Sequence, residues 1–148
     1  MKPVEVVTNY DISLLPLLNK PMKLQEHEWE VMKTHSNIGY EILKDSKRAI
    51  IQAGAIIARD HHEKWDGTGY PAGKSAEDIH IYGRIAAMAD VYDALRHRRC
   101  YKSPWTPEAV LAHIVSESGR QFEPALVEIL KSRVDKIEAI LQKYPDDE

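Results

Sequence analysis

The sequence predicts an all-α domain, a bundle of about five main helices with one long loop. Apolar residues recur at helical spacing in several stretches between residues 25 and 141, and no alternating pattern typical of β-strands runs for any length. No internal repeat is evident either. With 148 residues, the chain has the size of one domain and can bury a real core. We therefore expect a single helical bundle over residues 1–148.

The N-terminal part is expected to hold an irregular lead-in and two helices. Residues 1–24 carry apolar positions that Pro16 and Pro21 interrupt, so no regular element is assigned to them. A first helix begins at Gln25. Its apolar residues at helical spacing are Trp29, Met32, Ile38, Ile42 and Leu43, and its acidic residues Glu26, Glu28 and Glu30 lie near its start. A second helix covers about residues 48–62. Because it is apolar over much of its surface, we expect it to be central to the bundle.

A long loop over residues 63–82 precedes the third helix. Structureless loops of this length in compact domains are usually functional, and this one is rich in glycine. The third helix covers about residues 84–96, where Asp90 sits among small apolar residues. Because burying an unpaired carboxylate is costly, Asp90 must find a cation, hydrogen-bond donors or a metal.

The C-terminal part is expected to hold two more helices behind a basic segment. That segment, residues 96–102, fits either a solvated helix end or a contact with an anionic phosphodiester. Thr106 is expected to cap the fourth helix, with Pro107 at its first position and an end near Gly119. The last helix opens at Phe122-Glu123-Pro124 and carries apolar residues as far as Leu141.

Composition and charge exclude several kinds of function. The net charge of -3 and a pI near 6.2 provide no basic excess for binding nucleic acid. The single Cys100 excludes an intrachain disulfide framework. No apolar run approaches the ~20 residues needed to span a bilayer, and the N-terminus lacks the apolar core of a signal peptide. We therefore expect a cytoplasmic protein with no nucleic acid and no membrane among its partners.

Two adjacent histidines, His61 and His62, close the second helix directly before the turn-rich loop. Imidazole is a common ligand of zinc, iron and related metals. The alternative is a helix C-terminus that collects histidines for its dipole. His35 lies near the apolar stripe of the first helix, where a lone histidine is more often a boundary residue than a ligand. Together with Asp90, these histidines come from three successive helices, which can assemble a metal site.

Several motifs, in order and with compatible spacing, resemble the signature of the HD-GYP family. They are Lys33-Thr34-His35, His61-His62-Glu63-Lys64-Trp65-Asp66-Gly67-Thr68-Gly69-Tyr70-Pro71, Ala89-Asp90-Val91-Tyr92-Asp93-Ala94-Leu95 and Gly119-Arg120-Gln121-Phe122-Glu123-Pro124. The resemblance covers about residues 18–130. It implies an all-α phosphohydrolase that cleaves cyclic di-GMP, a bacterial second messenger, with divalent ions of the iron or manganese type. Such ions stabilise the attacking and leaving oxygens of the phosphodiester.

The resemblance also implies roles for single residues. The residues that match the family's metal ligands are His35, His61, His62 and Asp90, and of these Asp90, His61 and His62 are the expected catalytic residues. Contacts to cyclic di-GMP or a related phosphodiester are implied for Gly69, Tyr70, Pro71, Arg99 and Lys102.

The His-Asp pair of the family has no clear counterpart in this sequence. Counting back from His35 without gaps puts the pair on Val6-Val7, and neither valine can bind a metal. A short deletion would align Tyr10-Asp11 with the pair, but a tyrosine would still replace the histidine. The sequence is therefore expected to be a partial, N-terminally truncated HD-GYP-like domain.

Two interpretations of the function stay open. In the first, the chain is a hydrolase of this family whose site is completed by a partner chain or by Asp11. In the second, it is a non-catalytic module that binds cyclic di-GMP or another protein. Because the second and last helices carry more apolar positions than a small bundle readily covers, we also expect a homodimer.

Overall fold

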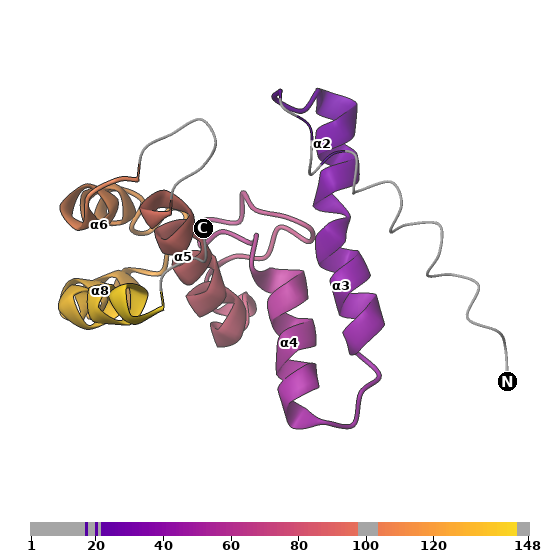
Figure 1. Ribbon diagram of the computed structural model, residues 1–148. Coiled ribbons are helices and arrows are strands. Elements are labelled where there is room, and N and C mark those ends of the chain that lie inside the picture. The colour runs from indigo at the N-terminus through magenta and orange to yellow at the C-terminus, as the bar shows by residue number, and fades with distance from the viewer. Residues whose placement is uncertain (1–16, 18–19, 21, 98–103, 145–148) are drawn as a thin grey trace, which may run out of the picture.

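The computed structural model describes residues 17, 20, 22–97 and 104–144, and this part of the chain is helical (Figure 1). Its helices are α2 (Glu26–Lys33), α3 (His35–Leu43), α4 (Ala49–Asp60), α5 (Ile81–Arg96), α6 (Pro107–Ser116), α7 (Pro124–Lys131) and α8 (Val134–Lys143), with a 3₁₀ turn η1 (Ala76–Asp78). The described residues contain no β-strand, only an isolated bridge between Ser118 and Phe122. The prediction of an all-α fold is confirmed.

Two of the expected helices are each divided in two. The first is interrupted at Thr34, whose hydroxyl donates to the Val31 carbonyl at 2.6 Å. The backbone keeps turning there, since the Ile38 amide donates to the Thr34 carbonyl, and α2 and α3 form one column in Figure 1. The last helix is interrupted after Lys131, where the Ser132 hydroxyl donates to the Ile129 carbonyl at 2.8 Å. Hydroxyl side chains at such positions compete for backbone hydrogen bonds, which favours a break.

The helix starts follow the capping residues that the sequence offers. The Thr106 hydroxyl accepts from the Ala109 amide at 3.3 Å, and Pro107 is the first residue of α6, as expected. At the start of α2, the Gln25 amide donates to the Glu28 carboxylate at 2.7 Å. The helix α5 begins at Ile81, earlier than expected, because the His80 side chain accepts from an amide of its first turn.

The main core lies among the C-terminal helices and not around α4. Its buried side chains come from α5, α6, α7 and the turn before α7, and they are Met88, Tyr92, Val110, Ile114, Phe122, Val127 and Leu130. The helix α4 packs against α3 on one side and α5 on the other (Figure 1). The expectation that α4 would be central is wrong, since only Ala55 and Asp60 are buried in it and Ile50 is 79% exposed. No layer of the described residues covers its outer face.

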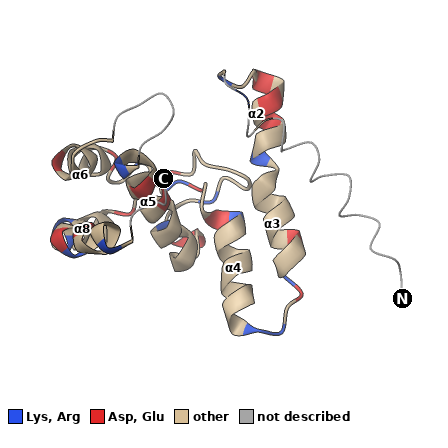
Figure 2. Cartoon of the chain, viewed as in Figure 1, with Lys and Arg blue, Asp and Glu red and all other residues tan. Residues whose placement is uncertain are grey.

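Charged side chains lie at the ends of α4, and its middle carries none, as Figure 2 shows. The outer helix α2 carries several acidic residues and ends at Lys33, next to the start of α3. Among the described residues, no helix combines the length and the apolar character needed to cross a membrane.

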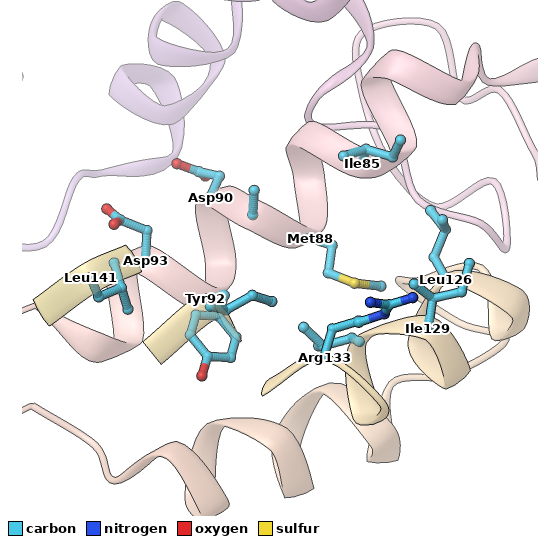
Figure 3. A pocket seen from close by; sticks show the side chains of 12 residues that line it. Ile85, Met88, Asp90, Tyr92, Asp93, Leu126, Ile129, Arg133 and Leu141 are labelled. Atoms are coloured by element: carbon cyan, nitrogen blue, oxygen red, sulfur yellow. The ribbon is translucent and has the colours of Figure 1, made fainter. Parts of the chain in front are cut away.

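An apolar groove of about 730 Å³ runs between α5, α7 and α8. Figure 3 shows Met88, Leu126 and Ile129 along it, with Arg133 reaching over its floor. Asp90 and Asp93 lie at the opposite end of the groove from Ile129. The groove therefore begins on the face of α5 that carries the candidate ligand Asp90.

A carboxylate on α8 fastens that helix to α5. The Tyr92 hydroxyl donates to Glu138 at 2.6 Å, and the Arg96 guanidinium donates to both Glu138 oxygens at 2.8 and 2.6 Å. Arg96 also donates to the Trp105 carbonyl at 2.5 Å, which fixes the segment that leads into α6. The bond from Arg96, assisted by the bond from Tyr92, holds the pKa of Glu138 below its usual value.

Replacing Glu138 by glutamine should destabilise the fold. We expect Glu138→Gln to lower the free energy of unfolding by about 1.5–3 kcal/mol, because it removes charge-assisted hydrogen bonds between half-buried groups. Glu128→Gln is the control, since Glu128 is an exposed partner of Lys131 on α7 and its loss should cost at most about 1 kcal/mol. Urea unfolding measures both variants.

The pH dependence of this difference follows from the lowered pKa of Glu138. Stability from a carboxylate of this kind is present above its unfolded pKa, about 4.3, and is lost as the pH falls through the folded value. The difference in the free energy of unfolding between the wild-type protein and Glu138→Gln should therefore become smaller below about pH 4. If Glu138→Gln and Glu128→Gln lowered the free energy of unfolding equally at pH 7, the stabilising role of Glu138 would be contradicted.

Candidate metal centre

Three histidines from two helix junctions meet at one place. His35 begins α3, directly after the break at Thr34, and His61 and His62 follow the last residue of α4. All three are half-buried, and one ring nitrogen of each lies within 4.8 Å of those of the other two. The Nε2 atoms of His35 and His61 are 3.3 Å apart. The structure thus brings together three of the four side chains that the sequence suggested as metal ligands.

Backbone hydrogen bonds fix the direction in which His35 and His61 point. Nδ1 of His35 lies 2.7 Å from the Met32 carbonyl, and Nδ1 of His61 lies 3.0 Å from the carbonyls of Ile57 and Ala58. A carbonyl can only accept, so each Nδ1 carries a proton, and each Nε2 atom faces the other ring. This is the orientation that metal-ligating histidines adopt.

Two lone pairs 3.3 Å apart repel each other unless a proton or a metal ion lies between them. Nitrogen ligands bound tetrahedrally to one ion, at about 2.0–2.1 Å each, are about 3.3 Å apart. The donor set therefore fits a divalent metal ion, and the spacing of the two nitrogens is the spacing that such an ion requires.

His62 is held in its neutral form. Burial, followed by the like charges of His61 and His35, lowers its pKa to about 4. At neutral pH its imidazole is uncharged and has a lone pair to offer. All three rings can therefore serve as neutral ligands.

Tyr70 covers one side of the three histidines. Its ring stacks on His62 with centroids 4.7 Å apart, and its amide donates to the His62 carbonyl at 3.2 Å. Burial, followed by the negative charge of Asp90, raises the pKa of Tyr70 to about 12. The phenol stays protonated at neutral pH and can donate a hydrogen bond.

Asp90 lies close to this site but outside the group of three histidines. Its negative charge contributes to the raised pKa of Tyr70, so Asp90 lies within electrostatic range of the site. The expectation that Asp90 would be buried is wrong, because the residue is exposed. Two expected substrate contacts, Arg99 and Lys102, lie outside the described part of the chain.

The loop after the histidines is folded around a buried carboxylate. Glu63 is 2% exposed, and its two oxygens accept from the amides of Ala72 and Lys74 at 2.8 and 3.0 Å. Gly69 passes so close to the same turn that a Cβ atom there would lie 2.4 Å from the Lys64 nitrogen. Only glycine fits this position, and Tyr70 is thereby brought onto His62.

A second carboxylate, Asp60, anchors the end of the same loop to α4. It is completely buried, and it accepts from Lys74 Nζ at 2.7 Å and from Arg59 Nε at 3.0 Å. Burial opposes its ionisation, but the bonds from Lys74 and Arg59 outweigh burial and keep its pKa below the usual value. The buried charge is therefore compensated and fastens the loop to the helix that carries His61.

The C-terminal motif supports the loop from the opposite side. The amides of Trp65 and Asp66 donate to the carbonyls of Gln121 and Arg120 at 3.1 and 2.8 Å. Glu123 forms an ion pair with Arg84 of α5 at 2.7 Å. The segment from Gly119 to Pro124 thus acts as a brace between the loop, α5 and the core.

Sequence reasoning assigned no role in the site to Asp60, Glu63, Lys74 or Trp29. Asp60 and Glu63 flank the histidine pair, and two carboxylates beside a turn-rich loop are a signal for loop anchoring that could have been used. The partner Lys74 lies too far along the chain to be recognised from spacing. Trp29 fitted the helical stripe and was therefore assigned to packing.

The sequence was compared with known proteins. A family model described as HD domain matches residues 12–126. The 3'3'-cGAMP-specific phosphodiesterase 2 of Vibrio cholerae is 48% identical over 130 residues, which cover 88% of this chain and 25% of that protein. The cyclic di-GMP phosphodiesterase response regulator RpfG of Xanthomonas campestris is 46% identical over 128 residues, which cover 86% of this chain and 34% of that protein.

A solved structure has the same fold. The crystal structure of a cyclic GMP-AMP specific phosphodiesterase of V. cholerae matches with a TM-score of 0.61 at 21% identity, over 88% of this chain and 33% of that one. Like the relatives in sequence, that protein is much longer, and the chain spans about a quarter to a third of the length of each.

The fold is that of an all-α HD domain, a class of metal-dependent proteins. The chain belongs to the HD domain family and, within it, to the HD-GYP type. The resemblance inferred from the motifs is thereby confirmed.

Removing the charge of Glu63 should loosen the loop while leaving the helices intact. In Glu63→Gln the side chain can no longer accept from both the Ala72 and Lys74 amides, so we expect these amides to exchange with solvent at least about 10-fold faster. Hydrogen exchange read by NMR measures this. Glu77→Gln, at an exposed position of the same loop, should leave both amides unchanged. Equal protection in Glu63→Gln would contradict the role of Glu63.

Proposed function

We propose that the chain carries the metal- and substrate-binding part of an HD-GYP phosphodiesterase site and that its ligand is a cyclic dinucleotide. The observation that carries this proposal is the pair of Nε2 atoms, on His35 and His61, that face each other beside His62 and Tyr70. The names of the relatives support the ligand, since they act on cyclic di-GMP or 3'3'-cGAMP.

The proposed metal is a divalent ion of the iron or manganese type. Its ligands would be His35, His61 and His62, with Asp90 as a further ligand from α5. Imidazole together with carboxylate suits such ions. When bound, an ion of this kind polarises a phosphoryl oxygen and makes water a better nucleophile at neutral pH.

The protein's own groups would hold the phosphodiester beside this ion. Tyr70 is a neutral phenol and can donate to a phosphoryl oxygen, and Gly69 and Pro71 on either side of it would line the groove. Lys33 Nζ lies 6.0 Å from the centre of the Tyr70 ring and would add positive charge. Contacts from Arg99 and Lys102 complete the proposal.

A second candidate function is binding without hydrolysis. The set of candidate ligands favours this function, because within the described residues the close group consists of histidines only and includes no carboxylate. A second cation next to the first needs carboxylate ligands to offset its charge. The sequence has Val6-Val7, or Tyr10-Asp11, where the family carries its His-Asp pair. We propose that the 148-residue chain alone binds one ion and the dinucleotide, and that hydrolysis needs ligands from Asp11 or another chain.

Two further expectations stay proposals. Residues 1–148 are proposed to form one partial HD-GYP-like domain, with residues 1–24 as its lead-in. The chain is also proposed to form a homodimer, and the large exposed apolar side chains at Ile42 and Ile50 support this.

Titration of the 148-residue chain with cyclic di-GMP, in the presence of excess Mn²⁺ or Fe²⁺, tests the proposed function. We expect binding that weakens at least about 10-fold in His61→Ala, because the ion that meets the phosphate is lost. His27→Ala, an exposed histidine on α2 outside the group, should bind like the wild-type protein.

Chromatography of the same mixture tests for the linear dinucleotide and GMP, and we expect neither to form. Turnover that disappears in His61→Ala would contradict binding without hydrolysis and would establish the hydrolase. An absence of binding would contradict the proposed function as a whole.

Light scattering over a wide range of protein concentration tests the homodimer. We expect the mass of two chains at high concentration, because exposed apolar side chains favour association. A single-chain mass at every concentration would contradict it.

A further inference from the structure

Trp29 is a large aromatic side chain that stays exposed beside Tyr70, the residue that stacks on His62. It lies on α2, a helix in which no residue is buried, and it is 46% exposed. Its ring meets the Tyr70 ring nearly at right angles, with centroids 6.1 Å apart. Leaving so much apolar surface in water is unfavourable, so a ligand that covers the indole ring would gain binding free energy.

The neighbours of Trp29 form a continuous surface that leads to the histidines. Tyr70 contacts Trp29 and, on another side, stacks on His62. Lys33 lies one helical turn after Trp29, with its Nζ near the Tyr70 ring, and its exposed partner Glu30 is 2.6 Å away. An aromatic surface and a cation therefore lie side by side at the edge of the proposed phosphate site.

We propose that Trp29 stacks on one purine base of the cyclic dinucleotide and that Lys33 faces the phosphate next to that base. This inference rests on the proposed function, which puts a phosphate of the ligand at the three histidines. Every purine has a flat π-face, and an indole ring can stack on such a face whichever base it belongs to. A lysine ammonium is a suitable partner for the neighbouring phosphate.

The competing role for Trp29 is packing, in which its ring only holds α2 against Tyr70. The two roles differ in what can replace the ring. A leucine preserves apolar contact with Tyr70 but has no π-face, whereas a phenylalanine preserves both. Packing predicts that both replacements are tolerated, and stacking predicts that only phenylalanine is.

Calorimetric titration of the Mn²⁺-loaded 148-residue chain with cyclic di-GMP separates the two roles. We expect Trp29→Ala and Trp29→Leu to weaken binding about 10-fold or more, and Trp29→Phe to stay within about 3-fold of the wild-type protein. Tyr82→Ala is the matched control, because Tyr82 is an equally exposed aromatic residue, 46%, on α5 whose ring contacts His80. Its affinity should not change.

Two further readouts exclude an indirect effect. The affinity for Mn²⁺ alone should be equal in all four variants, because none of them removes a histidine. Addition of cyclic di-GMP should quench the tryptophan fluorescence of the wild-type protein, and most of that quenching should disappear in Trp29→Phe although the nucleotide still binds.

Full affinity in Trp29→Leu, or quenching that persists in Trp29→Phe, would overturn the stacking role. Equal affinity for cyclic di-GMP in the wild-type protein and in Trp29→Ala would overturn this inference and leave the proposed function standing. A wild-type protein that binds Mn²⁺ but no cyclic di-GMP would overturn both.

Discussion

The candidate metal centre depends on hydrogen bonds between two imidazole rings and the carbonyls of helix ends. The last carbonyls of a helix have no partner within the helix. The Nδ1 proton of His35 is donated to Met32 near the end of α2, and that of His61 to Ile57 and Ala58 near the end of α4. Each bond gives a carbonyl near the helix end a side-chain donor and also directs an Nε2 atom towards the other ring. Local helix termination and ligand geometry are therefore set together.

The loop that carries Tyr70 is held in place by two buried carboxylates. Glu63 and Asp60 are buried charges, and each is matched by donors from the loop that it anchors. Because an uncompensated buried carboxylate is costly, the loop cannot move away from Glu63 and Asp60 without a large loss of free energy. The result is an irregular segment with a fixed position on a helical frame, which is what a binding site needs to present Tyr70 beside His62.

The parts of the fold that sequence reasoning predicted are those with a local cause. Helical periodicity and the cap at Thr106 located the helices, and the motifs around His35, His61 and His62 identified three side chains that meet in the structure. Its errors have non-local causes. The apolar character of α4 suggested a central helix, but which elements cover it is decided by the packing of α6 to α8 on α5.

Asp90 and Trp29 illustrate the same limit at the level of the site. Small apolar neighbours in sequence suggested that Asp90 is buried, yet the residue is exposed. Trp29 matched a helical stripe, but α2 has no buried residue for that stripe to join. Helical spacing establishes which residues share a face, and it does not establish what that face meets.

Metal content tests the central claim most directly. The 148-residue chain, loaded with Mn²⁺ or Fe²⁺ and freed of loosely held metal by gel filtration, is measured by elemental analysis beside His35→Ala, His61→Ala, His62→Ala and the control His27→Ala. The three-histidine site predicts about one ion per chain in the wild-type protein and in His27→Ala, and its loss in the other three variants. Metal that stays in those variants, or a wild-type protein that holds none, would contradict the account.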